Sequence, residues 1–337
     1  MVEAFVDGKP VSRLAVSDLV IRIGLARLRT GGVGGVWTDK AWRGRGLASR
    51  CMDEAVRRMQ ACGFHLSMLF GIRDFYHRWG YASVMAEPRA VIRTEFARQA
   101  RGDPRLRMIP FDRTRHARAA IALEERSHGM RPGTLDHRRG ARWRLFRVGS
   151  DWGIRTHARL ACDRRGRPAG YVVFDRVEDR VAVIEAGFHD RRVIPTLVAA
   201  AARQAMAREV DEITFFLPPD HAVVEYLRRW NVAMTIDSYA GAHGMGRIIN
   251  LAPVLRACET ELARRWRSSG MAGRRRPELS RLVSRWPPGL LLQLLLGYRG
   301  VEDAVTLPGV RIPVASHPAL KALFPPAFPY LWKTDRF

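Results

Sequence analysis

The sequence contains very little lysine and cysteine, and it has no long hydrophobic run. Only Lys9, Lys40, Lys321 and Lys333 are lysines. The four cysteines are scattered without a Cys-x-x-Cys pair, which argues against a disulfide framework and a structural zinc site and is typical of a reducing compartment. The longest apolar stretch, 290–296, is far shorter than the ~20 residues that span a bilayer, and the first residues do not resemble a signal peptide. We therefore expect a cytoplasmic protein with no membrane span and no bound metal.

Acidic residues are also too few to balance the arginines. The chain has 33 Asp and Glu against 57 Lys and Arg, which gives a formal net charge of +24. Such a charge indicates nucleic acid, an acidic membrane surface or a polyanionic small molecule as a partner. The excess of basic residues is 6 in residues 1–95, 9 in 96–243 and 9 in 244–337, and no nucleic-acid motif accompanies it. We therefore expect no nucleic-acid partner, and we interpret the charge as a preference for arginine along the whole chain.

The 337 residues, 47% of them hydrophobic, are enough for two or three domains with buried cores. Hydrophobic patterns predict strands at 3–6, 11–16, 19–25 and 33–37, a turn at 30–32, a helix from 47 to about 62, a strand at 66–70 and a short helix at 73–79. Further on they predict a helix at 117–126, a basic stretch at 138–146, a hairpin at 170–184, a helix at 194–208 and a strand at 213–217. This second run repeats the order of the first, which indicates an internal duplication.

The C-terminal third has a different pattern. A helix is expected to open at 247–251 and to run to about Trp266, followed by a linker at 268–277. The chain from Phe324 to Phe337 is rich in proline and aromatic residues and is apolar to its last residue. Because exposed termini are usually polar, we expect this terminus to be packed inside the protein.

The strongest functional signal is a strand that runs into a turn with two glycines and then a helix. Val36-Trp37-Thr38 ends the strand, and Arg43-Gly44-Arg45-Gly46-Leu47-Ala48 opens the helix. The first N–H groups of a helix are unpaired and bind anions, glycine lets a pyrophosphate approach the backbone closely, and arginine adds charge-assisted hydrogen bonds. An ordinary turn with solvated arginines has the same pattern, so the motif alone leaves both readings open.

Other segments give this motif its context. Residues 43–48 fit R-x-x-G-x-A and resemble the acyl-coenzyme A signature of the GCN5-related N-acetyltransferases (GNAT). Phe75 to Tyr81 resembles the closing F-Y-x-x-x-G-[FY] segment of that superfamily. The second unit has 188–192 (Phe-His-Asp-Arg-Arg) where the glycines belong, and the chain ends in Phe337 after a landmark at 245–251. This order is similar to the enhanced intracellular survival (Eis) family of acetyltransferases.

The resemblance implies an α/β (α+β) fold in three parts. It implies tandem GNAT-like mixed-sheet domains, with a catalytic domain at 1–95 and a degenerate copy at 96–243, followed by a small sterol-carrier-protein-like α+β domain at 244–337. Members of the family begin with a strand and two helices that wall the acceptor pocket, whereas only 36 residues precede Trp37 here. We therefore expect a first domain that is truncated at its N-terminus, either because the start codon lies upstream or because the acceptor site is open or covered differently.

The resemblance also implies an activity and a site. The donor would be acetyl-coenzyme A, the acceptor an amine of a small molecule or a protein, and the assembly a possible homo-oligomer. The backbone N–H of Val36 would stabilise the oxyanion, Tyr76 would be the general acid, and the main-chain carboxylate of Phe337 the general base or an amine-positioning group. The pyrophosphate would be held by Thr38, Arg43, Gly44, Arg45, Gly46, Leu47 and Ala48.

Each of these roles has an alternative. Tyr76 also fits a core tyrosine, and Phe337 a terminus that is merely packed. The chain as a whole also fits an acyl-coenzyme A-binding or regulatory module that has lost turnover.

Overall fold

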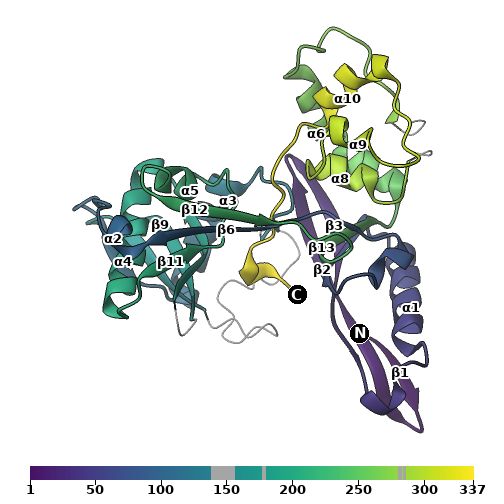
Figure 1. Cartoon of the computed structure of the whole chain (residues 1–337), viewed down its shortest axis with the longest axis horizontal. Coiled ribbons are helices and arrows are strands. Elements are labelled where there is room, and N and C mark those ends of the chain that lie inside the picture. Colours follow the sequence, from purple (N-terminus) through teal and green to yellow (C-terminus); the bar gives the residue numbers. More distant parts are fainter. Residues whose placement is uncertain (138–155, 177–179, 280–282, 284–285) are drawn as a thin grey trace.

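The computed structural model describes residues 1–137, 156–176, 180–279, 283 and 286–337, so the basic stretch at 138–146 lies outside the described residues. Figure 1 shows two β-sheets side by side, with the helices of the C-terminal third above the first of them. The first and second sheets have the strand orders β1-β2-β3-β4-β13-β5 and β12-β6-β11-β10-β9-β8-β7.

The first sheet is built around a long hairpin. Its strands are β1 (Val2–Val6), β2 (Lys9–Ile23), β3 (Ala26–Thr38), β4 (Leu66–Gly71), β5 (Ala82–Ser83) and β13 (His243–Ile248). Helix α1 (Leu47–Ala61) packs on one face through residues that include Met52 and Met59. The other face packs against α6 (Leu251–Arg267) and the helices that follow it. Two short 3₁₀ helices, η1 (Lys40–Trp42) and η2 (Tyr76–Trp79), flank the strands.

Two local expectations for this sheet are wrong. The turn of the long hairpin lies at Gly24, where φ is +57°, whereas 30–32 lies inside β3. Gly31 and Gly32 are extended there because they pair with both β2 and β4, and a β-carbon on Gly31 would lie 2.2 Å from the sulfur of Met59. Residues 247–248 belong to β13 and not to a helix, because pairing along β4 from Gly71 to Leu66 fixes them in a strand. Helix α6 begins only at Leu251.

The second sheet carries a helix layer on each face. Its strands are β6 (Glu87–Arg93), β7 (Arg107–Pro110), β8 (Thr156–Cys162), β9 (Pro168–Arg176), β10 (Val181–Phe188), β11 (Glu212–Phe215) and β12 (Val232–Asp237). Helix α3 (Arg113–His128) packs on one face, and α4 (Ile194–Ala207) packs on the other together with α2 (Thr94–Ala97) and α5 (Ala222–Leu227). The 3₁₀ helix η3 (Arg191–Val193) leads into α4.

The two sheets share the repeated order that the sequence predicts. In the first, the antiparallel hairpin β2–β3 is followed by α1 and by β4, which pairs parallel to β3. In the second, the antiparallel hairpin β9–β10 is followed by α4 and by β11, which pairs parallel to β10. We call the residues around the second sheet the second unit. The arrangement is consistent with tandem GNAT-like domains.

Sheet membership differs from the expected domain limits in two places. Strand β6, which precedes residue 95, pairs with β11 and β12 in the second sheet. Strand β13, at the expected start of the third domain, pairs with β4 and β5 in the first sheet. Strand pairing over long sequence separations decides both memberships, and a change in local composition does not reveal such pairing.

The C-terminal third also differs from the expected α+β domain. In the described part of 249–337 the regular elements are helices only: α6, α8 (Leu290–Leu296), α9 (Val301–Ala304), η4 (Val314–Ser316), α10 (His317–Leu323) and η5 (Lys333–Asp335). These helices share one hydrophobic core with the first sheet, in which Leu292 and Leu320 lie with Ile21 and Met68. The apolar stretch 290–296 is therefore a helix buried among other elements.

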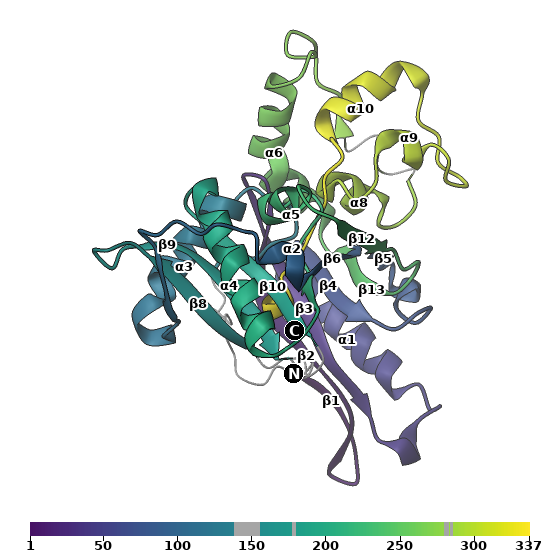
Figure 2. The same ribbon diagram turned by 60° about the vertical axis from the view of Figure 1, so that its left-hand side comes forward.

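The chain ends in a segment, 324–337, that we call the C-terminal tail. It leaves the C-terminal helices and runs between the two sheets, where both views place the end of the chain (Figures 1 and 2). Tyr330 and Trp332 lie in the core of the second unit, and the side chain of Phe337 lies in the core shared by the first sheet and the C-terminal helices. Trp332 is fully buried and Phe337 is 8% exposed, so the prediction of a packed terminus is confirmed.

Candidate active site

The predicted site residues gather where β3 and β4 part. The two strands pair in parallel from Thr30 to Val33 and from Leu66 to Leu69. Beyond this point β3 pairs with β2, and β4 pairs with β13 on its other side. We call the diverging ends, 34–38 of β3 and 70–71 of β4, the first fork. A fork of this kind leaves main-chain groups of the inner edges outside the β-ladder.

Val36 lies at a β-bulge in this fork. The β2–β3 register pairs Ala15 with Gly34 and Arg13 with Trp37, so Gly35 and Val36 together face Leu14. Gly35 has φ +61°, which favours glycine. A bulge of this kind takes residues out of the ladder and redirects their backbone groups. The bulge therefore sets Val36 apart from the regular register at the position where the predicted oxyanion donor is needed.

The predicted phosphate-binding residues lie between the end of β3 and the start of α1. Gly44 and Gly46 have φ of +75° and +72°, and Gly46 caps α1 without a side-chain hydrogen bond. A β-carbon on either glycine would meet nothing within 4 Å, so the left-handed backbone and not crowding requires glycine here. The turn that leads into α1 is thus uncrowded beside both glycines.

Side chains around this turn are held by local contacts. Arg43 and Arg45 are exposed, and Leu47 and Ala48 form the half-buried first turn of α1. The Arg43 Nε donates to the carbonyl oxygen of Thr38 at 3.3 Å, and the Arg45 guanidinium lies 4.5 Å from the ring centroid of Trp42. The hydroxyl of Thr38 shares a hydrogen bond of 2.9 Å with that of Ser12. The structure therefore brings Thr38 and residues 43–48 together at one helix end.

Tyr76 lies on η2 just after β4. Its ring covers Gly71 at the fork, where a β-carbon would lie 2.4 Å from the Tyr76 Cε2 atom. Burial raises the pKa of the Tyr76 hydroxyl, which keeps it protonated at neutral pH. Within the described residues this hydroxyl makes no hydrogen bond. By contrast, the Tyr81 hydroxyl is bound to Ser67 at 2.6 Å, and burial raises its pKa to about 12.

Phe337 reaches the same fork from the end of the chain. A β-carbon on Gly34 would lie 2.6 Å from the main-chain carbonyl carbon of Phe337 and 2.9 Å from its oxygen. The Phe337 ring covers Gly32 and meets the Phe70 ring edge-on, with 6.0 Å between centroids. Phe337 and Tyr76 belong to the cores on the two opposite faces of the first sheet. Both predicted catalytic residues therefore border the fork, one on each face.

Several residues that build this site do not stand out in the sequence. They are the glycines beneath Phe337, and the residues that bind the tail before it reaches the fork. The five residues from Gly31 to Gly35 include four glycines, and glycine inside a strand often marks close backbone approach. Thr30-Gly31-Gly32 is also typical of a turn, and that pattern hides the close approach of the tail. The partners of the tail, which include Glu185 and Glu87, carry no local signal at all.

The described part of the chain also bears on metal binding and membrane insertion. No group of three or more His, Cys, Asp or Glu residues gathers there as metal ligands. None of the helices described is long and apolar enough to cross a membrane.

Comparisons with known proteins relate this geometry to a superfamily. Residues 1–84 match the family model of an acetyltransferase (GNAT) domain. No curated protein sequence matches the chain. A GCN5-related N-acetyltransferase from Kribbella flavida superposes with a TM-score of 0.68 at 19% identity, covering 98% of this chain and 86% of that one.

Two further solved structures are similar over a smaller part. A probable N-acyltransferase from Enterococcus faecalis superposes with a TM-score of 0.59 at 16% identity, covering 74% of this chain, which spans 62% of that protein. Eis1 from Mycobacterium abscessus superposes with a TM-score of 0.52 at 15% identity, covering 76% of this chain and 66% of Eis1. At these identities the likeness concerns the fold. Residues 1–84 thus match a GNAT acetyltransferase domain, and the solved structures are similar to this chain in fold.

Proposed function

We propose that this protein is an N-acetyltransferase that transfers an acetyl group from acetyl-coenzyme A to an amine of a small molecule or of an exposed protein side chain. The observation that carries the proposal is the position of Phe337, whose main-chain carbonyl group lies against Gly34 at the first fork. A carboxylate at this place would meet the amine where the acyl group is transferred. The match of residues 1–84 to an acetyltransferase domain supports the same reading.

The residues present fit the phosphates of a coenzyme. The turn at Gly44 and Gly46 is uncrowded and leads into the first N–H groups of α1, and a helix N-terminus favours an anion there. Arg43 and Arg45 are exposed beside it and are available for charge-assisted hydrogen bonds. When bound, the coenzyme supplies an acyl group activated as a thioester. Residues 43–48 bind its pyrophosphate, and Thr38 closes the same side of the turn.

Val36 and Tyr76 stabilise the two charges that develop during transfer. The N–H of Val36, which the bulge takes out of the regular register, donates to the oxygen that becomes negative when the amine attacks. Tyr76 donates the proton that the departing thiolate needs. The hydroxyl is protonated at neutral pH, and its lack of a hydrogen-bond partner among the described residues leaves its proton available.

The main-chain carboxylate of Phe337 acts on the acceptor side. An amine attacks only in its neutral form, so a carboxylate that takes up its proton, directly or through one water, speeds the step. Burial of the Phe337 side chain in the core under the sheet fixes the direction of the main chain at the fork. The carboxylate therefore binds and orients the amine and accepts its proton.

Release of free coenzyme A thiol tests the proposal. The full chain is mixed with acetyl-coenzyme A and a panel of polyamines, aminoglycosides and lysine peptides, and thiol is followed with a colorimetric disulfide reagent. We expect thiol release that depends on one class of amine. Mass spectrometry should find that amine ~42 Da heavier, because an acetyl group replaces one hydrogen. Calorimetric binding of acetyl-coenzyme A without any release would instead favour a binding module.

A further inference from the structure

Three consecutive residues of the tail are bound by three different elements of the second unit and its neighbours. The Thr334 hydroxyl donates to Oε2 of Glu185 on β10 at 2.5 Å. Asp335 lies 3.2 Å from Nε2 of His137, and Arg336 donates to Glu87 on β6 at 2.6 Å. The Asp335 and His137 side chains are 0% and 1% exposed. The main chain is therefore fixed over the three residues before Phe337.

These contacts lie in a second fork that corresponds to the first. Strands β10 and β11 pair in parallel from Val181 to Val183, and the last bond there runs from the N–H of Phe216 to Val183. Beyond it the register of β10 shifts between Val183 and Glu185, as the register of β3 shifts around Val36. Ile184 is the extra residue of this bulge, and Glu185 follows it and pairs with Val173, so Glu185 lies next to the bulge of the second unit.

The tail fills this second fork. Tyr330 donates its hydroxyl proton to the carbonyl oxygen of Phe216 at 2.9 Å, which satisfies the main chain just past β11. The Lys333 ammonium lies 3.5 Å from the centroid of the Phe216 ring. With Thr334 on Glu185, the tail occupies the fork of the second unit before its last residue reaches the fork of the first.

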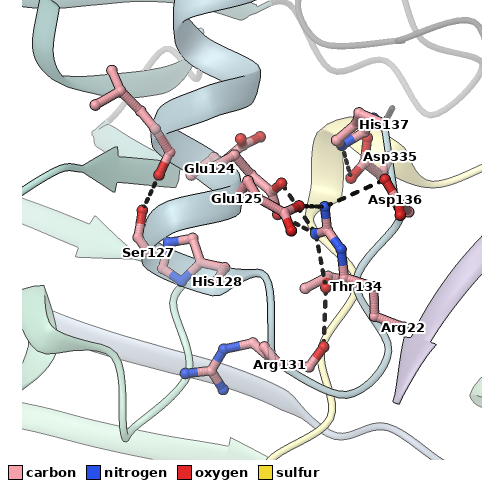
Figure 3. A network of polar contacts seen from close by, with 12 residues as sticks. Arg22, Glu124, Glu125, Ser127, His128, Arg131, Thr134, Asp136, His137 and Asp335 are labelled. Carbon is pink, nitrogen blue, oxygen red and sulfur yellow. Dashed lines mark hydrogen bonds and ion pairs between the residues drawn. The ribbon is translucent and has the colours of Figure 1, made fainter. Parts of the chain in front are cut away.

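Figure 3 shows where Asp335 enters the polar network between the two units. His137 faces Asp335, and Arg22 of β2 lies beside Glu124, Glu125 and Asp136. A carboxylate as buried as that of Asp335 is costly without a positive partner, so the His137 contact ties the tail to one position. A tail that slipped by one residue would place Thr334 or Arg336 opposite His137 and would lose this pairing.

We propose that the second unit is a clamp for the C-terminal tail, and that Glu185, His137 and Glu87 are positioning residues that hold Phe337 at the first fork. Its catalytic consequence rests on the proposed function. The polar contacts at 334–336 and the ring of Phe337 in the core fix the main-chain end from both sides. Transfer depends steeply on the placement of reacting groups, so loosening the clamp lowers turnover although no reacting group is removed.

Variants of the tail test the clamp in the full-length protein. Asp335→Asn removes the charge facing His137, and Arg336→Met removes the ion pair with Glu87. Amide hydrogen exchange of the peptide 331–337 is measured together with kcat, KM for the amine and calorimetric affinity for acetyl-coenzyme A. We expect tail exchange to rise about tenfold and kcat to fall about tenfold, with coenzyme affinity unchanged within about twofold. Arg336→Lys keeps the positive charge, so its tail exchange and its kcat should both lie close to the wild-type values.

The control is Asp237→Asn. It removes the ion pair between Asp237 on β12 and Arg89 on β6 of the same unit, and neither residue contacts the tail through that pair. It should change neither exchange at 331–337 nor kcat. Unchanged tail exchange in both tail variants, or faster exchange with wild-type kcat, overturns the clamp. If Asp335→Asn fails to fold by circular dichroism, the Arg336 variants decide. A wild-type protein that transfers to no amine refutes the proposed function, whereas tail exchange still decides whether the tail is clamped.

Discussion

The guanidinium group of Arg22 on β2 lies 2.8 Å from the carboxylate of Glu124 on α3, and neither side chain is exposed to solvent. The pair joins the first sheet to the second unit over 102 residues of sequence. Burial raises the pKa of Glu124, and Arg22 opposes that rise. Because both charges are buried, the contact between the units is stable only while Arg22 and Glu124 neutralise each other.

Arg22→Met should therefore destabilise the protein by about 3–5 kcal/mol, because it leaves buried Glu124 without its cation. The double variant with Glu124→Gln should be more stable than the single variant, since it removes the uncompensated charge. The free energy of unfolding of the wild type and of both variants is measured by urea unfolding. A double variant no more stable than Arg22→Met would contradict the account.

Glu185 should make stability fall as pH rises. Burial raises the pKa of its carboxyl to about 8, and the nearby Asp335 adds to the rise. Between the ordinary pKa of glutamate and pH 8, the folded protein keeps a proton that the unfolded chain has released, so folding weakens with rising pH. Glu185→Gln cannot ionise. Relative to this variant, the wild type should lose roughly 1 kcal/mol per pH unit from pH 5 to 8 in urea unfolding.

Titrating groups that do not interact with Glu185 are common to both proteins and cancel in that difference. His137 does interact with it: burial lowers the pKa of His137, but Asp335 and the neighbouring carboxylates, Glu185 among them, outweigh burial and raise it to about 9. Its stabilising contribution is complete below the ordinary histidine pKa and is lost as pH rises through 9. A difference between wild type and Glu185→Gln that does not change with pH would show that Glu185 is ionised in the folded protein.

Tyr76→Phe should lower kcat about 100-fold and leave the affinity for acetyl-coenzyme A within about twofold, because it removes only the proton donor. The matched control is Tyr81→Phe, which removes a buried hydroxyl bound to Ser67. That variant should cost about 1–2 kcal/mol of stability and little activity. Steady-state kinetics and thermal melting separate the two effects. Equal losses of kcat in both variants would remove Tyr76 from the mechanism.

Gly34→Ala should displace the end of the tail. Its β-carbon would lie 2.6 Å from the carbonyl carbon of Phe337, so one of the two must move. We expect kcat to fall about tenfold or more while the coenzyme still binds. Gly270→Ala is the control, because its β-carbon meets nothing within 4 Å. Wild-type turnover in Gly34→Ala would show that the position of Phe337 does not matter for transfer.

Gly46→Glu should weaken binding of acetyl-coenzyme A about tenfold or more, because it places a negative side chain where the phosphates bind. Gly63 is a close match at the other end of α1. It also has φ +72° and open space around a β-carbon. Gly63→Glu therefore carries the same backbone strain and charge but should bind the coenzyme normally in calorimetry. Equal affinity of the two variants would mean that the phosphate turn is misassigned.

The features of this protein that depend on residues close together in the sequence could be predicted from the sequence. The glycine turn, helix α1 and the packed terminus follow from local pattern, since Gly44, Gly46 and the apolar run to Phe337 each need only a few neighbours to be interpreted. The hydrogen bond between Thr334 and Glu185 spans 149 residues, and no periodicity marks either partner. For the same reason, the sequence does not predict that β13 belongs to the first sheet. The pattern at 247–248 is typical of a helix, but these residues pair with β4, which lies about 180 residues earlier in the chain.

The place of β13 in the first sheet has a consequence for how the chain is made. Strand β5 pairs with β13, at Ser83 with Met245 and at Ala82 with Gly246, and β4 pairs with β13 along its length. During synthesis this edge of β4 therefore stays bare until residue 248 has left the ribosome, about 180 residues after β4 itself. At roughly 5–20 residues per second the wait lasts on the order of ten seconds or more. A fragment cut at residue 95 would keep that bare edge permanently and should aggregate.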